Sequence, residues 1–158
     1  MQKVTPFLWF NDQAGEAAKL YTSAFKNSKI LGTRYYPSGA PGEAGKVMSV
    51  TFEIEGTEFT AFNGGPVFKF TPAISLFVNC DTQEEVDMLT EQLTAGGGAQ
   101  SQCAWITDRF GISWQIVPVR LGQLLQDKDP VKAKRVMQAM LKMNKIDIKA
   151  LEAAYEGV

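Results

Sequence analysis

The 158-residue sequence contains no histidine and only two cysteines. Histidine is the usual general base near neutral pH and the commonest nitrogen ligand of catalytic metals. Its absence excludes triads built on histidine and zinc sites of the usual kinds. Cys80 and Cys103 are too few for a disulfide framework or a cysteine-rich metal site. Carboxylates, amides, hydroxyls, thiols, lysine and tyrosine therefore remain for any chemistry.

Excess charge and long apolar segments are also lacking. The formal net charge is −1, so we expect neither nucleic acid nor an anionic membrane surface as a partner. No segment is long and apolar enough to span a bilayer. The N-terminal stretch is interrupted by Asp, Glu and Asn, which does not fit an export signal. These features predict a cytoplasmic protein with reduced thiols.

The first part of the chain predicts a strand, a helix and a hairpin. The apolar run over residues 5–10 suits a strand buried on both faces. Asn11 and Asp12 are N-cap candidates for a helix over residues 13–25, whose apolar side chains recur every three or four positions. Residues 46–62 alternate in polarity around Gly56-Thr57, which predicts a hairpin reversing there. The Pro- and Gly-rich loop over residues 37–45 is either a lid or a plain surface loop.

The same order starts again after residue 70. "PAISLFVNC" predicts a strand, and Asp81 with Glu84 resembles a capping box that begins a helix ending near Gly96. "CAWITDRFGISWQIVP" predicts two strands around a turn at Phe110-Gly111. Placing Leu8 on Phe77 also superposes other similar positions along the helices. The residues thus indicate a weak internal repeat with a shared order of elements.

Beyond Pro118 the composition predicts helices. Residues 122–125 form a short helical piece, Asp129-Pro130 is a good helix start, and Asp147 can cap a last helix. Several methionines give the middle helix an apolar side. They indicate flexible core filler rather than a metal or haem site.

Four stretches resemble one protein family. "TPFLWFNDQAGEAAKLYTSAF", "FNGGPVFKFTPAISLFV", "CAWITDRFGISWQIVP" and "VMQAMLKMNKIDIKALEAA" are similar to the PhnB-like, or demethylubiquinone methyltransferase-like, branch of the vicinal oxygen chelate superfamily. That superfamily includes glyoxalases, extradiol dioxygenases and bleomycin resistance proteins. The resemblance implies an α+β fold of two tandem βαβββ modules, at about residues 1–66 and 72–118. Helices over residues 119–158 complete a single domain, and a cup-shaped cavity and a homodimer are expected.

The resemblance also implies which residues line the cup. The superfamily's ligand positions fall on the first and last strands of each module, and the final turn places Gln115 where metal-binding relatives carry a carboxylate. The amide of Gln115 either points into the cup or is satisfied by neighbouring backbone groups. Cys103 is either a nucleophile or a small packing residue. The candidate ligand-binding residues are Thr5, Phe7, Trp9, Asn63, Ser75, Cys103 and Gln115.

These residues offer neither charge nor imidazole, so we expect no metal and no cofactor. The leading hypothesis is a metal-independent protein that binds or transforms a small organic molecule. One alternative is a metal-dependent lyase, isomerase or dioxygenase, and another is a drug-sequestering binder without turnover. The glycines of "TAGGGAQ" follow a helix rather than precede one, which does not suit an adenosyl cofactor. The sequence does not name the substrate or the reaction.

Overall fold

The computed structural model describes residues 2–158. The chain divides into two compact units, one ending at Phe70 and the other beginning at Thr71. Each unit contains one four-stranded mixed sheet. Among residues 2–158, no helix combines the length and the hydropathy needed to cross a membrane.

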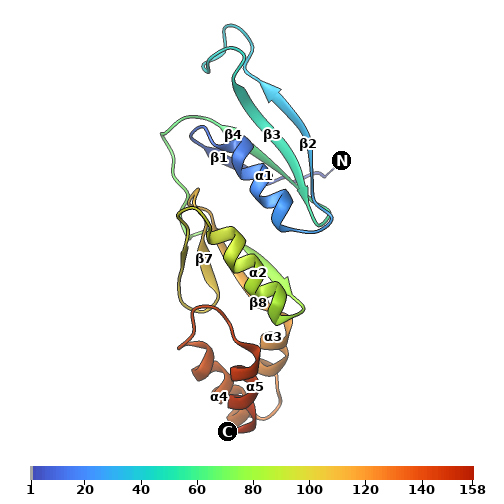
Figure 1. The fold of residues 1–158 in the computed structure, drawn as a ribbon, viewed down its shortest axis with the longest axis vertical. Helices are drawn as coiled ribbons and strands as arrows, with labels where there is room; N and C mark the ends of the chain where they lie inside the picture. The colour runs from blue at the N-terminus through green and yellow to red at the C-terminus, as the bar shows by residue number, and fades with distance from the viewer. Residues whose placement is uncertain (1) are drawn as a thin grey trace. The chain divides into compact units, whose positions relative to one another are not determined.

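The first unit follows the order strand, helix, three strands (Figure 1). Its sheet has the strand order β1-β4-β3-β2. Strand β1 pairs with β4 in parallel, and the other two pairings are antiparallel. The elements are β1 (Phe7–Phe10), α1 (Ala14–Ala24), β2 (Lys29–Tyr35), β3 (Val47–Ile54) and β4 (Thr57–Asn63).

The second unit repeats this order and pairing. Its sheet has the strand order β5-β8-β7-β6. The strands that come first and last in the chain, β5 and β8, again pair in parallel. The elements are β5 (Ser75–Cys80), α2 (Gln83–Thr94), β6 (Ala99–Gln100), β7 (Trp105–Thr107) and β8 (Ser113–Pro118). The predicted α+β fold of two tandem βαβββ modules is therefore confirmed.

The helix starts agree with the alignment of the repeat. Helix α1 begins at Ala14 and α2 at Gln83, which are 69 residues apart, as are Leu8 and Phe77. In the parallel strand pairs, Phe7 lies opposite Thr60, and Phe77 lies opposite Gln115.

Helix α1 covers one face of the first sheet. Ala17, Ala18 and Tyr21 have no exposed surface, and Tyr21 packs against Phe52 of β3 with ring centroids 5.9 Å apart. The prediction that the first strand is buried on both faces was wrong, because Phe7 is 60% exposed. On the face that meets α1, Val50, Phe52 and Ala61 are buried.

The start of α1 also differs from the prediction. Its N-cap is Gln13, which makes no side-chain capping bond, rather than Asn11 or Asp12. The backbone N–H of Ala14 instead donates to Oδ1 of Asn63, at 2.8 Å. Because β1 and β4 are parallel neighbours, the end of β4 lies beside the start of the helix and supplies the acceptor.

Two local predictions were displaced by one residue. The hairpin between β3 and β4 reverses at Glu55 and Gly56, which have φ values of 47° and 86°. Two consecutive residues with positive φ are typical of the type I′ turn, which matches the twist of the flanking strands. Helix α2 is capped by Thr82 through Glu85 rather than by Asp81 through Glu84. The Glu85 carboxylate also accepts from the backbone N–H of Asp81, the residue before the N-cap, at 2.9 Å, so the arrangement is a variant of the capping box.

The end of α2 agrees with the prediction. Gly96 follows the C-cap residue Ala95 and has a φ of 77°. This left-handed conformation is what a residue just beyond a helix end commonly adopts, and glycine adopts it without a steric penalty.

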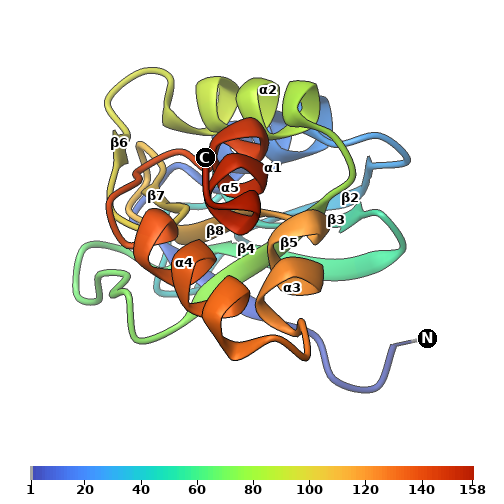
Figure 2. The same ribbon diagram turned by 90° about the horizontal axis from the view of Figure 1, so that it is seen from below.

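Three helices follow β8 and form their own apolar cluster within the second unit (Figure 2). They are α3 (Val119–Leu125), α4 (Pro130–Met140) and α5 (Ile148–Glu156). Asp129 and Asp147 cap the last two, as predicted. The buried members of the cluster are Ala104, Leu121, Leu124, Val136, Ile146 and Leu151.

Candidate functional site

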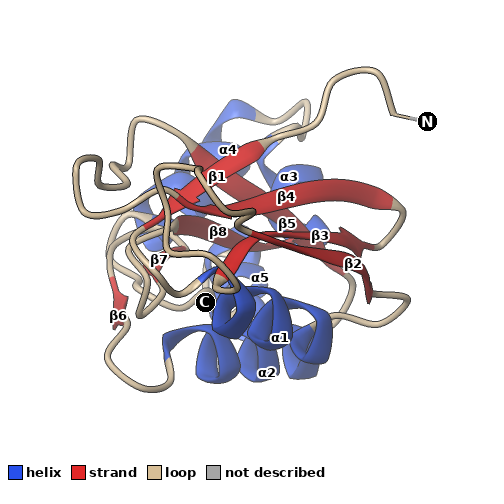
Figure 3. Ribbon diagram, turned by 90° about the horizontal axis from the view of Figure 1, so that it is seen from above, coloured by secondary structure: helices blue, strands red, loops and turns tan. Residues whose placement is uncertain are grey.

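In the second unit, one face of the sheet is covered and the other is open. Helix α2 lies along the covered face (Figure 3). Trp114 and Ile116 are buried there. Side chains alternate along a strand, so Gln115 belongs to the other face. Cross-strand pairing brings further residues to that face. We call it the second open face, and its residues are Ser75, Phe77, Trp105, Thr107, Ser113 and Gln115.

Gln115 makes one side-chain hydrogen bond on this face. Its Nε2 donates to Oγ of Ser75 at 3.0 Å, between the neighbouring parallel strands β8 and β5. Both side chains are half-buried. Among residues 2–158 the structure gives Oε1 of Gln115 no hydrogen-bond partner. The amide therefore offers an acceptor at the surface, and the Ser75 hydroxyl can donate in turn.

A hollow of about 330 Å³ opens at the β7 side of this face. Trp105, which lies directly opposite Gln115, contributes to it together with Thr107 and Ser113. The full lining is Pro72, Ser101, Gln102, Trp105, Ile106, Thr107 and Ser113. None of these side chains is charged. The hollow therefore combines an indole ring with neutral donors and acceptors.

The turn between β7 and β8 holds these strands in register. Asp108 is 2% exposed, and its Oδ1 accepts from the backbone N–H groups of Phe110 and Ile112, at 2.9 and 3.0 Å. Its Oδ2 accepts from Nε1 of Trp114 at 3.0 Å. Gly111 completes the turn with a φ of 97°. The "DRFG" segment is thus built around one buried carboxylate.

The first unit also has an open face, on the side away from α1. Trp9 lies opposite Phe62, and the two rings meet edge to face with centroids 5.2 Å apart. Phe7 packs against Phe62 at the same centroid distance. Phe68, from the segment after β4, meets Trp9 at 4.9 Å. Thr5, just before β1, is half-buried and its Oγ1 accepts from Nε2 of Gln2 at 3.4 Å.

Gly64 and Gly65 both contact the indole ring of Trp9 and hold it in position. A side chain at Gly64 would come within 2.3 Å of the indole, so only glycine allows this approach. The next residue, Gly65, accepts the indole Nε1–H through its carbonyl at 2.9 Å and has a φ of 95°. The positive φ of Gly65 is a conformation that glycine adopts without a steric penalty.

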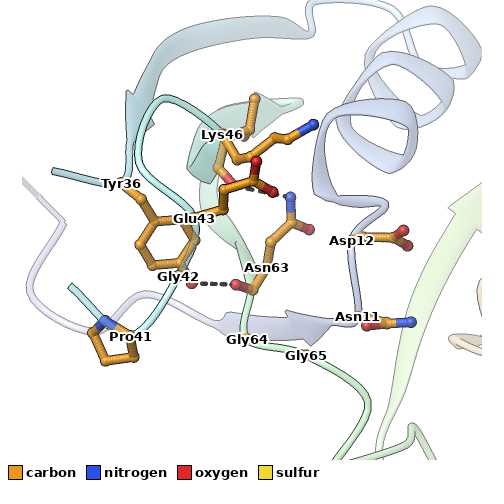
Figure 4. Close-up of a pocket in the computed structure, with 11 residues that line it drawn as sticks. Asn11, Asp12, Tyr36, Pro41, Gly42, Glu43, Lys46, Asn63, Gly64 and Gly65 are labelled. Carbon is orange, nitrogen blue, oxygen red and sulfur yellow. Dashed lines mark hydrogen bonds between the residues drawn. The ribbon is translucent and has the colours of Figure 1, made fainter. Parts of the chain in front are cut away.

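Asn63 does not share a face with Trp9. Its amide bridges the N–H of Ala14 and the carbonyl of Val47, at 2.8 and 3.1 Å, which joins the start of α1 to the start of β3. Its backbone carbonyl accepts from the hydroxyl of Tyr36 (Figure 4). The Asn63 side chain therefore has a structural role that the sequence pattern did not reveal.

Asn63 also lines a pocket of about 620 Å³ at the ends of β1 and β4, which we call the polar pocket. The loop between β2 and β3 forms one wall of it, and the segments after β1 and β4 form the other (Figure 4). Its lining residues are Asn11, Asp12, Tyr36, Pro41, Gly42, Glu43, Lys46, Val47, Asn63, Gly64 and Gly65.

Cys103 lies in the turn before β7 rather than on the second open face. It has a φ of 58°, and its backbone N–H donates to the carbonyl of Met143 at 2.9 Å. Its Sγ lies 3.8 Å from the carbonyl oxygen of Met140. The other thiol, Cys80, is fully buried, and this burial, with the nearby Glu85 and Asp81 carboxylates, raises its pKa to about 12. Cys80 is therefore a protonated packing residue at neutral pH.

The structure thus groups some of the candidates and separates others. Ser75 and Gln115 lie together in the second unit, and Phe7 and Trp9 lie together in the first. Asn63 and Cys103 lie apart from both faces. Sequence reasoning gave no role to Thr107, although its alternation with Ile106 and its place opposite Ser113 follow from the hairpin register.

The second open face does not fit a divalent metal ion. Among residues 2–158, no three His, Cys, Asp or Glu side chains lie close enough together to hold a metal. The polar groups on the face are one amide, three hydroxyls and the indole N–H of Trp105, which cannot bind a metal. Hard cations require carboxylates and waters, and zinc or iron requires nitrogen, sulfur or several carboxylates.

Comparison with known proteins identifies the family. The family model described as 3-demethylubiquinone-9 3-methyltransferase matches residues 2–117. The chain belongs to this family. The solved structure of the PhnB protein from Bacillus cereus, which carries the same description, is 37% identical. Its TM-score is 0.68, and the match covers 75% of this chain and 100% of that one.

Two further comparisons complete the picture. The structure of protein PA1353 from Pseudomonas aeruginosa has a TM-score of 0.60 at 22% identity, covering 75% of this chain and 98% of that one. At that identity the likeness shows the shared fold alone. Among proteins with curated descriptions, none matches. The comparisons therefore assign the PhnB-like family and its fold to this chain, and they do not assign a reaction.

Proposed function

We propose that this PhnB-like protein binds a small, uncharged organic molecule on its second open face, without a metal ion. The observation that carries the proposal is the Gln115–Ser75 hydrogen bond of 3.0 Å beside a hollow lined by uncharged side chains. The free Oε1 of Gln115 accepts a donor from the ligand. The hydroxyls of Thr107 and Ser113 can donate or accept.

Shape and charge both support this ligand class. Ligand sites are concave, mostly apolar and carry a few placed polar groups, and Trp105 supplies a flat apolar surface for an aromatic or conjugated ring. A charged ligand would lose hydration at this face without gaining a counter-ion, which is costly. A neutral, flat molecule with amide, carbonyl or hydroxyl groups satisfies the available partners.

Methyl transfer is not part of the proposed function. A nucleotide-type methyl donor is commonly bound where a strand runs through a glycine-rich turn into a helix. In the described residues, β1 is joined to α1 through residues 11–13 and β5 to α2 through residues 81–82, and neither connection contains glycine. The family description therefore shows which proteins this chain is related to. The ligand class proposed here rests on the residues of this chain and differs from a methyl donor.

Manganese titration tests the metal-independent part. We expect that MnCl₂ leaves the backbone amide signals of Ser75 and Gln115 in ¹⁵N-labelled protein as sharp as those of other half-buried residues. Selective broadening at these two residues would contradict the proposal. The variant Gln115→Glu, which adds a carboxylate at the same place, serves as the control and should show more broadening there than the wild type.

We propose separate roles for the remaining candidate residues. Thr5, Phe7 and Trp9 provide an aromatic surface on the open face of the first unit, suited to an apolar group. Cys103 acts through the turn that holds Trp105. Substituting Cys103 with serine should therefore leave the ligand contacts in place, whereas Trp105→Ala should remove the stacking surface.

We further propose that the protein is a cytoplasmic homodimer. Phe7 and Phe77 are 60% and 55% exposed, and exposed apolar side chains of this size are typical of surfaces that meet a partner. Light scattering coupled to size exclusion should give twice the mass of the chain. A monomer mass at tens of micromolar would contradict the dimer without affecting the ligand proposal.

A further inference from the structure

The polar pocket of the first unit differs in character from the second open face. It lies where the parallel strands β1 and β4 end, and its volume of about 620 Å³ is in the range of small-molecule sites. Unlike the uncharged hollow of the second unit, its lining includes Asp12, Glu43 and Lys46. It therefore suits a ligand of another class.

The wall formed by the loop is fixed by several contacts. The backbone of Tyr36 pairs with that of Lys46 and Gly45, at 2.8 and 2.9 Å, which closes the base of the loop. The Tyr36 hydroxyl donates to the carbonyl of Asn63 and links the loop to the end of β4. A side chain at Gly42 would come within 2.4 Å of the Tyr36 ring, so the ring packs directly on the loop backbone. The pocket wall is thus formed before any ligand arrives.

Within residues 2–158, the charged side chains of the pocket form no ion pair with another side chain. The two ion pairs within residues 2–158 join Arg120 to Glu152 and Lys145 to Asp87, and neither involves the pocket. Asp12 comes from the connection after β1, and the other two charges come from the loop. Carboxylates and an ammonium group therefore line one concave surface, beside the apolar ring of Tyr36.

We propose that the polar pocket is a second binding site, specific for a small zwitterion that carries both an ammonium group and a carboxylate, as an amino acid does. The ligand's ammonium group pairs with Asp12 and Glu43, and its carboxylate pairs with Lys46. The apolar part of the ligand packs on the Tyr36 ring. This site is independent of the one proposed for the second unit.

A matched set of three probes tests the charge requirement. L-phenylalanine carries both charges, phenethylamine only the ammonium group, and 3-phenylpropionate only the carboxylate. In ¹⁵N titrations we expect L-phenylalanine to shift the amide signals of Gly42, Gly64 and Gly65 with a dissociation constant below about 1 mM. Each single-charge probe should bind about fivefold more weakly, since each lost ion pair at a part-exposed site contributes up to about 1 kcal/mol. Equal binding of all three, or no binding of L-phenylalanine at millimolar concentration, would overturn the proposal.

Charge-removing variants assign the partners. Lys46→Gln should weaken L-phenylalanine binding about fivefold and leave phenethylamine binding unchanged, whereas Asp12→Asn should weaken both. Lys19→Gln, an exposed change on α1, is the matched control and should alter neither. Each variant's melting temperature verifies folding. If Lys46→Gln binds L-phenylalanine as the wild type does, or if the shifts fall on Trp105 and Gln115 instead, the zwitterion site is refuted.

Discussion

Replacement of Asp108 by alanine should destabilise the second unit strongly. The carboxylate accepts three hydrogen bonds, and two of the donors belong to buried residues: the N–H of Ile112, 5% exposed, and the indole of Trp114, 2% exposed. Leaving a buried donor without an acceptor costs about 1–3 kcal/mol. The two buried donors together set an expected loss of about 4 kcal/mol in the free energy of unfolding. The third donor, on half-buried Phe110, can turn to water.

Urea unfolding followed by tryptophan fluorescence measures this loss. Asp108→Asn should lose about 2 kcal/mol, because the amide oxygen keeps the backbone donors while its NH₂ group faces the indole N–H. Asp147→Ala removes an exposed N-cap on α5 and, as the control, should cost only about 1 kcal/mol. A loss below that of the control for Asp108→Ala would refute the account of the turn.

Four further tests address other parts of the structure. Glu55→Asn should raise the free energy of unfolding by about 0.5 kcal/mol in a urea titration, because asparagine tolerates the φ of 47° better than glutamate, and a loss would contradict the turn assignment. Gly64→Ala should displace the Trp9 ring and lower the melting temperature, which an unchanged near-UV circular dichroism spectrum would rule out. In native protein, Ellman's reagent should titrate Cys103 and spare Cys80. Folding raises the Cys80 pKa from 9.0 to about 12, so the thiol of the unfolded chain ionises at a lower pH than the thiol of the folded protein. The free energy of unfolding should therefore fall between these pH values, more steeply than in Cys80→Ala. Equal slopes for the two proteins would contradict the burial argument.

The sequence predicted the fold well where periodicity and helix caps are strong. The order of elements in both modules follows from patterns within a few residues, and so do the helix starts at Asp129 and Asp147. The error at the α1 start has a physical cause. The start depends on which strands pair, because the Asn63 bond to Ala14 joins residues far apart in the chain.

The site was predicted less completely for the same reason. Ser75 and Gln115 were proposed as separate cup positions, and the parallel pairing of β5 with β8 is what joins them. Asn63 has the right residue type for a ligand contact, yet its face is set by the strand register. The polar pocket is formed by three separate segments of the chain, so no local sequence motif could predict it.

Titration of ¹⁵N-labelled protein with nicotinamide and, separately, nicotinate tests the central claim most directly. The two probes share a flat ring of the same size and differ in charge, so they separate a neutral site from an anion site. The account predicts that nicotinamide shifts the amide signals of Trp105, Thr107 and Gln115, and that nicotinate does so much more weakly. Preferential binding of nicotinate at these residues, or nicotinamide shifts confined to the first unit, would contradict it.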